Sequence, residues 1–206
     1  LSAAVEAAQA GVSVVLFEKY PFLGGSTMVS GGGMSGAGHQ FQIEAGIVDD
    51  SPETHFADLL REGAYRNNLL LAKVFTDNAG AAIDWLADLG CEFMFTPGFP
   101  EHSIQRFVRS YPYPGTGIAI IQALDNAAKE AGADIQLDST VTELVTNTAG
   151  EVIGVQGVRG DGSAFTAMGQ RVILATGGYV GNDDMLWEFA PDIMAMNPAV
   201  AGDTRL

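Results

Sequence analysis

The fold class follows from one short sequence, SVVLFEK at residues 13–19, in which a run of apolar residues ends in Glu18. The residues before it, 1–10, are strong helix formers closed by Gly11. A continuous apolar strand directly after a helix is typical of a parallel sheet that helices cover on both faces, because neither face of such a strand meets water. We therefore predict a helix at 1–10, a turn at Gly11 and a buried strand at 13–17.

Glu18 stands where a dinucleotide-binding fold places the acid that binds ribose. At the end of the second strand, such a carboxylate can accept hydrogen bonds from both hydroxyls of the adenosine ribose. The fingerprint G-x-G-x-x-G/A begins about 20 residues before this acid. Counting back from Glu18 makes Ala3 the third small residue of the motif and places the first glycine ahead of Leu1. We expect the chain to lack the first strand and most of the fingerprint; the alternative is that Glu18 and Lys19 merely end a strand in water.

A segment rich in Gly, Ser and Met follows this acid, from Gly24 to Gly38. Backbone N–H groups without neighbouring side-chain bulk can approach a pyrophosphate or the edge of an aromatic ring, and hydroxyl groups add short hydrogen bonds. The segment is therefore predicted to be a cofactor-binding loop. A flexible connection between two elements is the alternative.

The remaining pattern predicts an α/β, Rossmann-like domain over residues 1–206, with a parallel sheet, a helical layer and an inserted antiparallel β-meander at about 134–168. A second buried strand is expected at 171–175, leading into Thr176-Gly177-Gly178. The segment 98–117, with its prolines and glycines, is expected to be an extended loop. Helices are predicted at 52–63, 69–78, 79–89 and 116–131, and strands of the antiparallel layer at 134–137, 140–146 and 152–158.

Composition excludes several classes of function. The net charge of −15, from 25 carboxylates and 10 cations, argues against nucleic acid or an anionic membrane surface as a partner. Cys91 is the single cysteine, so no internal disulfide forms, and we expect it to be an ordinary core thiol. No cluster of Cys and His has metal-ligand spacing, and no apolar run is long enough for a transmembrane helix. Localisation does not follow from the sequence.

The strand that ends in Glu18-Lys19, the glycine-rich segment that begins at Gly24 and the run that leads into Thr176-Gly177-Gly178 follow one another in this order along the chain. Together they resemble the fumarate reductase and succinate dehydrogenase flavoprotein family. Within that family the chain is most similar to the soluble fumarate-reducing flavocytochromes, urocanate reductases and ketosteroid dehydrogenases. The similarity covers nearly the whole chain, which would then be a fragment without the N-terminal strand and the capping domain. The motifs are Val15-Leu16-Phe17-Glu18-Lys19, Leu23-Gly24-Gly25-Ser26-Thr27, Ser30-Gly31-Gly32-Gly33-Met34, Val172-Ile173-Leu174-Ala175-Thr176-Gly177-Gly178-Tyr179 with Asn182, and Gly202-Asp203.

This resemblance implies FAD as the cofactor. It places Glu18 on the FAD ribose, Ser26 and Thr27 near the pyrophosphate and ribityl chain, and Gly31 and Gly32 against the isoalloxazine. The remaining residues that we expect to contact the cofactor are Ala3, Lys19, Gly24, Gly25, Val141, whose backbone would meet the adenine, Ala175, Thr176, Gly177 and Asp203 near the ribityl end. For Val141 the alternative is an ordinary strand residue.

The resemblance also implies an activity: hydride transfer between flavin N5 and a carbon of an unsaturated carboxylate or enone. The residues that deliver the proton and clamp the substrate would follow Leu206, so we expect no catalytic residue within this chain. A separate domain or protein would donate the electrons. Two alternatives stay open, a non-catalytic α/β domain that no longer binds FAD and an NAD-linked Rossmann dehydrogenase.

The segment 109–117 precedes a predicted helix, whose N-terminus could favour an anion of the flavin or substrate. The alternative is that Arg106 and Arg109 are simply solvated cations on an acidic protein. The three histidines have no acid or nucleophile in a recognisable arrangement, so none is predicted to act as a general acid or base.

Overall fold

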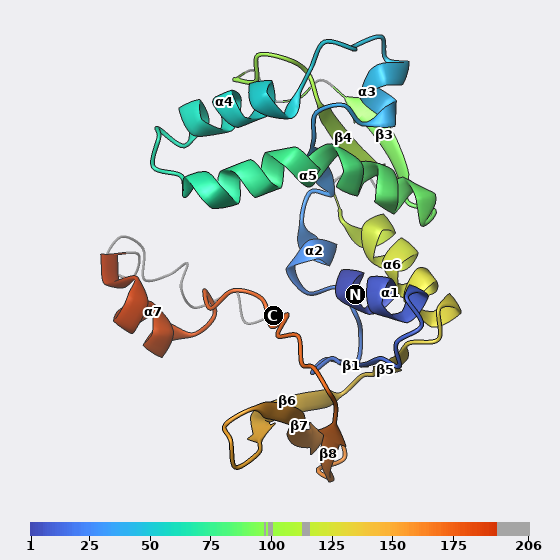
Figure 1. Ribbon diagram of the computed structural model, residues 1–206, viewed down its shortest axis with the longest axis vertical. Coiled ribbons are helices and arrows are strands. Elements are labelled where there is room, and N and C mark those ends of the chain that lie inside the picture. The colour runs from blue at the N-terminus through green and yellow to red at the C-terminus, as the bar shows by residue number, and fades with distance from the viewer. Residues whose placement is uncertain (97, 99–100, 113–115, 193–206) are drawn as a thin grey trace. The chain divides into compact units, whose positions relative to one another are not determined.

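The structure, a computed structural model, describes most of the chain as two compact units, Leu1–Thr140 and Val141–Leu206 (Figure 1). The helices of the first unit are α1 (Ser2–Gln9), α2 (Gly25–Val29), α3 (Gln40–Glu44), α4 (Pro52–Glu62), α5 (Leu69–Asp88) and α6 (Ile118–Glu130). Its strands are β1 (Val15–Phe17), β2 (Gly33–Ser35), β3 (Glu92–Thr96), β4 (Phe107–Tyr111) and β5 (Asp134–Gln136). The described residues are 1–96, 98, 101–112 and 116–192.

Two helix–strand pairs with the same local geometry build the lower part of this unit. After α1 ends, Gly11 leads the chain into β1, and after α6 ends, Gly132 leads it into β5. Both glycines have a positive φ, +80° and +85°, which lets the chain reverse after the helix. β1 and β5 then pair in parallel, with Val15 opposite Asp134. The predicted helix and glycine stop are therefore confirmed, and a strand forms over Val15–Phe17. The strand is not buried as predicted, because Val15 is 43% exposed and Leu16 and Phe17 are only half-buried.

The main apolar core lies where α1 and α6 pack together, joined by the C-terminal part of α5. Alanine dominates this core, and small side chains allow the helices to approach closely. Cys91 belongs to it, as expected, and burial raises the pKa of its thiol to about 11. The fully buried members are Val5 and Ala128, and the others include Ala8, Leu86, Ala119, Ile120, Ala123, Leu124, Ala127 and Ala133.

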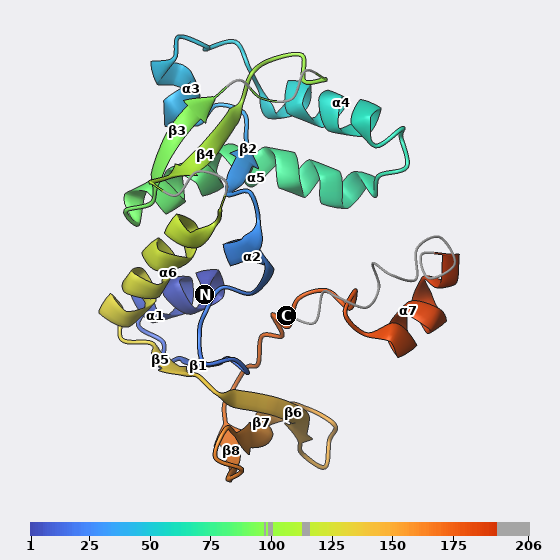
Figure 2. The same cartoon turned by 180° about the vertical axis from the view of Figure 1, so that it is seen from behind.

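The upper part of the first unit is a three-stranded antiparallel sheet in the order β2-β4-β3, beside α3, α4 and α5 (Figures 1 and 2). Two predictions were wrong here. The segment 98–117 contains strand β4, and the glycine-rich segment 24–38 contains helix α2 and strand β2. β4 forms because it pairs with β2 on one side and with β3 on the other. Since β2 is distant in sequence, the composition around β4 does not reveal this pairing.

α5 is one helix of 20 residues rather than two helices at 69–78 and 79–89. A single glycine inside a helix costs some stability but does not break it. Gly80 is needed for packing, since a Cβ at this position would collide with the carbonyl oxygen of Ala37. The predicted helices at 52–63 and 116–131 are confirmed as α4, capped by the Ser51 side chain, and α6.

The second unit contains most of a three-stranded sheet in the order β6-β7-β8. Its elements are β6 (Ser139–Thr146), β7 (Val152–Arg159), β8 (Ala164–Met168) and helix α7 (Asp183–Phe189). β7 and β8 are antiparallel, which agrees with the predicted meander. The meander begins later than predicted, however, because residues 134–136 pair in parallel with β1.

Residues 171–175 do not form the second buried strand that their apolar character predicts. They have no regular structure, and Ile173 and Leu174 are 69% and 63% exposed. A strand exists only where its N–H and C=O groups meet a neighbouring strand. Within the described residues the parallel sheet consists of β1 and β5 alone, and neither pairs with this run. Among those residues there is also no helix long and apolar enough to cross a membrane.

Candidate functional site

Glu18 directly follows β1, at the carboxyl end of the parallel pair. Its backbone N–H donates to the Gln136 carbonyl at 2.9 Å, and its carbonyl accepts from Ser139 N–H at 2.9 Å. The side chain is partly exposed, and its Oε1 accepts a hydrogen bond from the Tyr20 N–H at 2.9 Å. The carboxylate is thus held at the end of the strand by the chain that follows it, which sequence reasoning did not foresee.

The neighbours of Glu18 are also on the surface. Lys19 is exposed, with its ammonium group 4.7 Å from the centre of the Tyr20 ring. Ala3 lies on an exposed face of α1. A small residue there leaves the helix surface open, which is what the close approach of a cofactor requires.

A tight turn at Gly24 and Gly25 starts the short helix α2. Both residues have positive φ, +135° and +47°, a conformation that glycine adopts without strain. A Cβ at Gly25 would meet open space, and Ser26 and Thr27 are exposed beside it. Free backbone and two hydroxyl groups therefore lie together, as a phosphate-bearing cofactor requires.

Gly31 and Gly32 connect α2 with β2 and lie against the segment before α6. The carbonyl of Gly31 accepts from Arg109 Nη1 at 3.4 Å, and that of Gly32 accepts from Ser110 N–H at 2.8 Å. Gly32 is buried with φ +64°, and a Cβ there would collide with Ser110 Oγ and the Thr116 carbonyl. Only glycine fits this position, so the segment 24–32 has a fixed course.

This contact with the segment 109–117 is the part of the site that sequence reasoning missed. Ser110 donates from its hydroxyl to the Thr116 carbonyl at 2.9 Å, just ahead of α6. A Cβ at Gly117 would collide with the Thr27 carbonyl. The glycine and serine residues of this segment were the available signal, but a loop was the simpler interpretation.

Arg106 and Arg109 differ in their exposure to solvent. Arg106 is completely buried, so the interpretation of this residue as a solvated cation was wrong. Its guanidinium donates to both carboxylate oxygens of Asp50, at 2.8 and 2.9 Å, and to Asp58 at 2.7 Å. These hydrogen bonds hold the pKa of Asp58 well below its usual range, despite burial that would raise it. Arg109 is partly exposed and its guanidinium lies over the Phe107 ring.

The remaining predicted contacts lie in the second unit. Val141 is in β6 and 37% exposed. Ala175, Thr176 and Gly177 are exposed and lie outside any helix or strand, with Gly177 at φ +80°. Asp203 lies outside the described residues. Among the described residues no group of His, Cys, Asp and Glu could hold a metal ion.

An acid after a parallel strand and a glycine turn with free hydroxyls define a dinucleotide-binding α/β domain. The chain belongs to the FAD binding domain family, whose model matches residues 1–204. The expected family and its cofactor, FAD, are confirmed, which argues against the NAD-linked alternative.

Similar proteins support the same family. The chain is 33% identical to a probable fumarate reductase of Shewanella frigidimarina, over 95% of this chain and 33% of that protein. It is 31% identical to a urocanate reductase of Eggerthella lenta, over 93% of this chain and 32% of that protein. A flavocytochrome c3 fumarate reductase in its open conformation has a TM-score of 0.82 at 31% identity, covering 93% of this chain and 34% of that one. The chain thus spans about a third of the length of these relatives.

Proposed function

We propose that this chain supplies the flavin-binding part of an FAD-dependent reductase of the fumarate reductase type. The observation that carries the proposal is the position of Glu18, with its partly exposed carboxylate at the end of β1, in a chain whose family binds FAD. Two ribose hydroxyls can donate to one carboxylate in this setting. The residues that we propose to hold FAD are Ala3, Glu18, Lys19, Gly24, Gly25, Ser26, Thr27, Gly31, Gly32, Val141, Ala175, Thr176, Gly177 and Asp203.

The substrate of the whole protein would be a small unsaturated carboxylate or an enone. The names of the similar proteins, a fumarate reductase and a urocanate reductase, support this class. Bound FAD would supply hydride transfer, and a separate domain or protein would supply the electrons. Within the described part, the contribution of this chain is binding and orientation. Glu18 would position the ribose, the exposed backbone of Gly31 would meet the flavin ring, and the buried Gly32 fixes the course of the segment.

A second candidate is an α/β domain that does not bind FAD by itself. The observation that favours it is the parallel sheet, which has two strands among the described residues, with the run 171–175 outside it. The proposed contact residues at the end of this run, Ala175, Thr176 and Gly177, would then be present in the sequence but not held in position to bind FAD.

Titration of the 206-residue chain with FAD, followed by flavin fluorescence, separates the two candidates. The first predicts saturable binding of one FAD per chain. It also predicts binding at least about tenfold weaker in Glu18→Gln, because the amide has only one oxygen that can accept from the ribose. Glu44→Gln, the same change at an exposed carboxylate of α3, is the matched control and should bind like the unmodified chain. No uptake of FAD, or equal losses in both variants, would contradict the first candidate.

A further inference from the structure

The side chain of Arg109 lies beside the glycine backbone that we propose to meet the flavin ring. Arg109 is in β4 and pairs with Gly33 of β2, so the strand register brings it next to the glycine-rich segment. Its Nη1 donates to the Gly31 carbonyl at 3.4 Å, and a Cβ built at Gly31 would lie 3.7 Å from the same nitrogen. The guanidinium therefore lies directly alongside Gly31, whose own surface is exposed.

The ring of Phe107 fixes the position of this guanidinium. Cζ of Arg109 lies 5.4 Å from the centre of the ring, and a planar guanidinium packs well on an aromatic face. Phe107 is only 8% exposed, and its ring lies so close to Gly33 that a Cβ there would collide with it. A buried ring on one side and the Gly31 carbonyl on another thus hold the positive charge near the backbone of Gly31.

Within the described part of the chain, no carboxylate forms an ion pair with Arg109. Arg106, three residues earlier, is in the opposite situation, because it is buried between Asp50 and Asp58. The charge of Arg109 therefore remains available to a negative group at the surface beside Gly31. The basic side chains that do form ion pairs in this part are Arg61, Lys73, His102, Arg106 and Lys129.

The N-terminus of α6 favours negative charge in the same place. This helix has 13 residues and begins after Gly117, without a side-chain cap and without an acidic residue in its first turn. It starts close to the glycine-rich segment, because a Cβ at Gly32 would collide with the carbonyl of Thr116. The first turn of a helix carries a partial positive charge, so it adds to the effect of Arg109.

We propose that Arg109 stabilises the negative charge of the reduced flavin ring and thereby raises the reduction potential of bound FAD. A hydride equivalent, which is two electrons and one proton, leaves the neutral ring with one negative charge when it is added to N5. Coulomb attraction acts over several ångströms near a protein surface, so Arg109 need not touch the ring. This inference rests on the proposed function, in which the exposed backbone of Gly31 meets the ring.

The reduction potential of bound FAD tests this role of Arg109. The 206-residue chain is loaded with FAD and reduced stepwise with dithionite at mildly alkaline pH, beside a reference dye of known potential. In Arg109→Gln the reduced cofactor should lose about tenfold in affinity relative to the oxidised cofactor, which lowers the two-electron potential by about 30 mV. The pyrophosphate has the same charge in both redox states, so any effect of Arg109 on it cancels in the potential.

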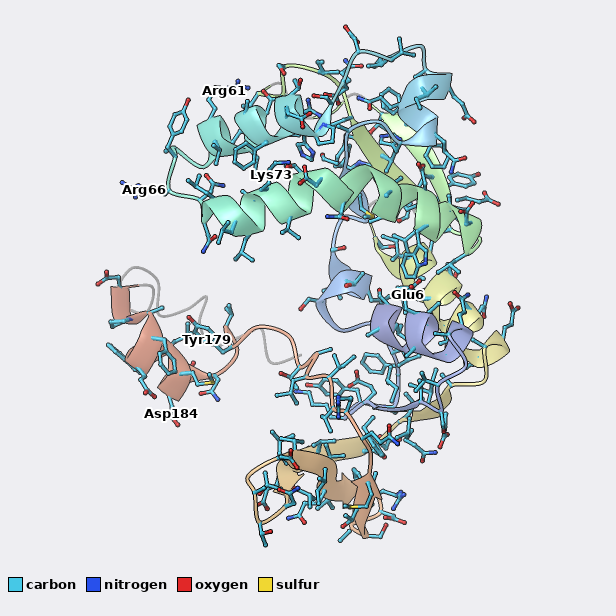
Figure 3. All side chains as sticks on the ribbon, in the orientation of Figure 1. Glu6, Arg61, Arg66, Lys73, Tyr179 and Asp184 are labelled. Atoms are coloured by element: carbon cyan, nitrogen blue, oxygen red, sulfur yellow. The ribbon has the colours of Figure 1, made fainter. Side chains whose placement is uncertain are left out.

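Two further variants separate the charge of Arg109 from its packing. Arg109→Lys keeps a positive charge and should change the same ratio of affinities by less than about threefold. Arg66→Gln is the matched control for the loss of one charge, because Arg66 is exposed and lies away from α2 (Figure 3); it should change the ratio by less than about twofold. A loss in Arg109→Lys as large as that in Arg109→Gln would overturn the electrostatic role.

The same measurements distinguish a failure of this inference from a failure of the proposed function. If the unmodified chain takes up FAD and Arg109→Gln leaves the potential unchanged, the role of Arg109 is rejected and the proposed function stands. If the unmodified chain takes up no FAD, both are rejected. Arg109→Met keeps an unbranched side chain over Phe107 and should lower the potential as much as Arg109→Gln, so it decides the proposal if the glutamine variant fails to fold.

Discussion

At the scale of single residues, buried charge concentrates on Arg106. Its guanidinium makes three hydrogen bonds to Asp50 and Asp58, all three residues being almost completely buried. Ser103 adds two hydrogen bonds to Asp58, at 3.0 and 2.8 Å, and Gln42 adds one to Asp50 at 2.8 Å. Among the described residues, removing Arg106 would leave Asp50 without an ion-pair partner and Asp58 with Arg61 alone.

Arg106→Met should therefore lower the free energy of unfolding by about 3–5 kcal/mol, since it removes the guanidinium that pairs with both buried carboxylates. The measurement is urea unfolding followed by circular dichroism. Arg66→Met is the matched control, because Arg66 is exposed at the surface, where Figure 3 labels it, and the change should cost less than about 0.5 kcal/mol. A loss of similar size in both variants would contradict the structural role of Arg106.

His55 predicts how stability depends on pH. Burial lowers the pKa of its folded state from 6.5 to about 4, so between these values the unfolded chain binds a proton that the folded chain does not. The free energy of unfolding should fall as pH decreases from about 6.5 towards 4, and His55→Phe should flatten this dependence. Urea unfolding at several pH values measures it. His39, whose pKa burial also lowers, should leave a residual slope in the variant; an unchanged slope would count against a neutral, buried His55.

At the scale of elements, the packing of α5 depends on Gly80. The helix passes so close to Ala37 that only a residue without a side chain fits. The C-terminal part of α5 in turn contributes Leu86 to the main core. A change at this contact between Gly80 and Ala37 should therefore affect the stability of the whole first unit.

Gly80→Ala should destabilise the protein by about 1–3 kcal/mol, because the added methyl group forces the backbone apart. The sign is informative, since in an open helical position the same change would stabilise by up to about 1 kcal/mol. Thermal unfolding measures the difference. Gly178→Ala is the control and should have little effect, because a Cβ at Gly178 would meet open space. A Gly80→Ala protein that is more stable than the unmodified chain would show that α5 and Ala37 are farther apart than described.

At the scale of the whole molecule, the chain consists of two units and spans about a third of the length of its relatives. The proposed FAD contacts are divided between these units, with Glu18 and the glycine turns in the first and Val141 and 175–177 in the second. The titration proposed above therefore uses the whole chain, which carries the proposed contacts of both units.

The sequence by itself determined the helix–strand pair around Glu18, because that pair depends on short-range features: helix formers, a glycine stop and an apolar run. The family and the cofactor followed from the resemblance of the motifs to known flavoproteins. The same reasoning placed the glycine turn after Glu18 but not its fixed course, which depends on Ser110 and Thr116 about 80 residues later. Only the tertiary structure decided that 107–111 form a strand and 171–175 do not, since a strand depends on a partner and not on its own apolar character. It also decided that Arg106 is buried between two carboxylates and that His55 is buried, because burial of polar residues results from contacts between distant segments.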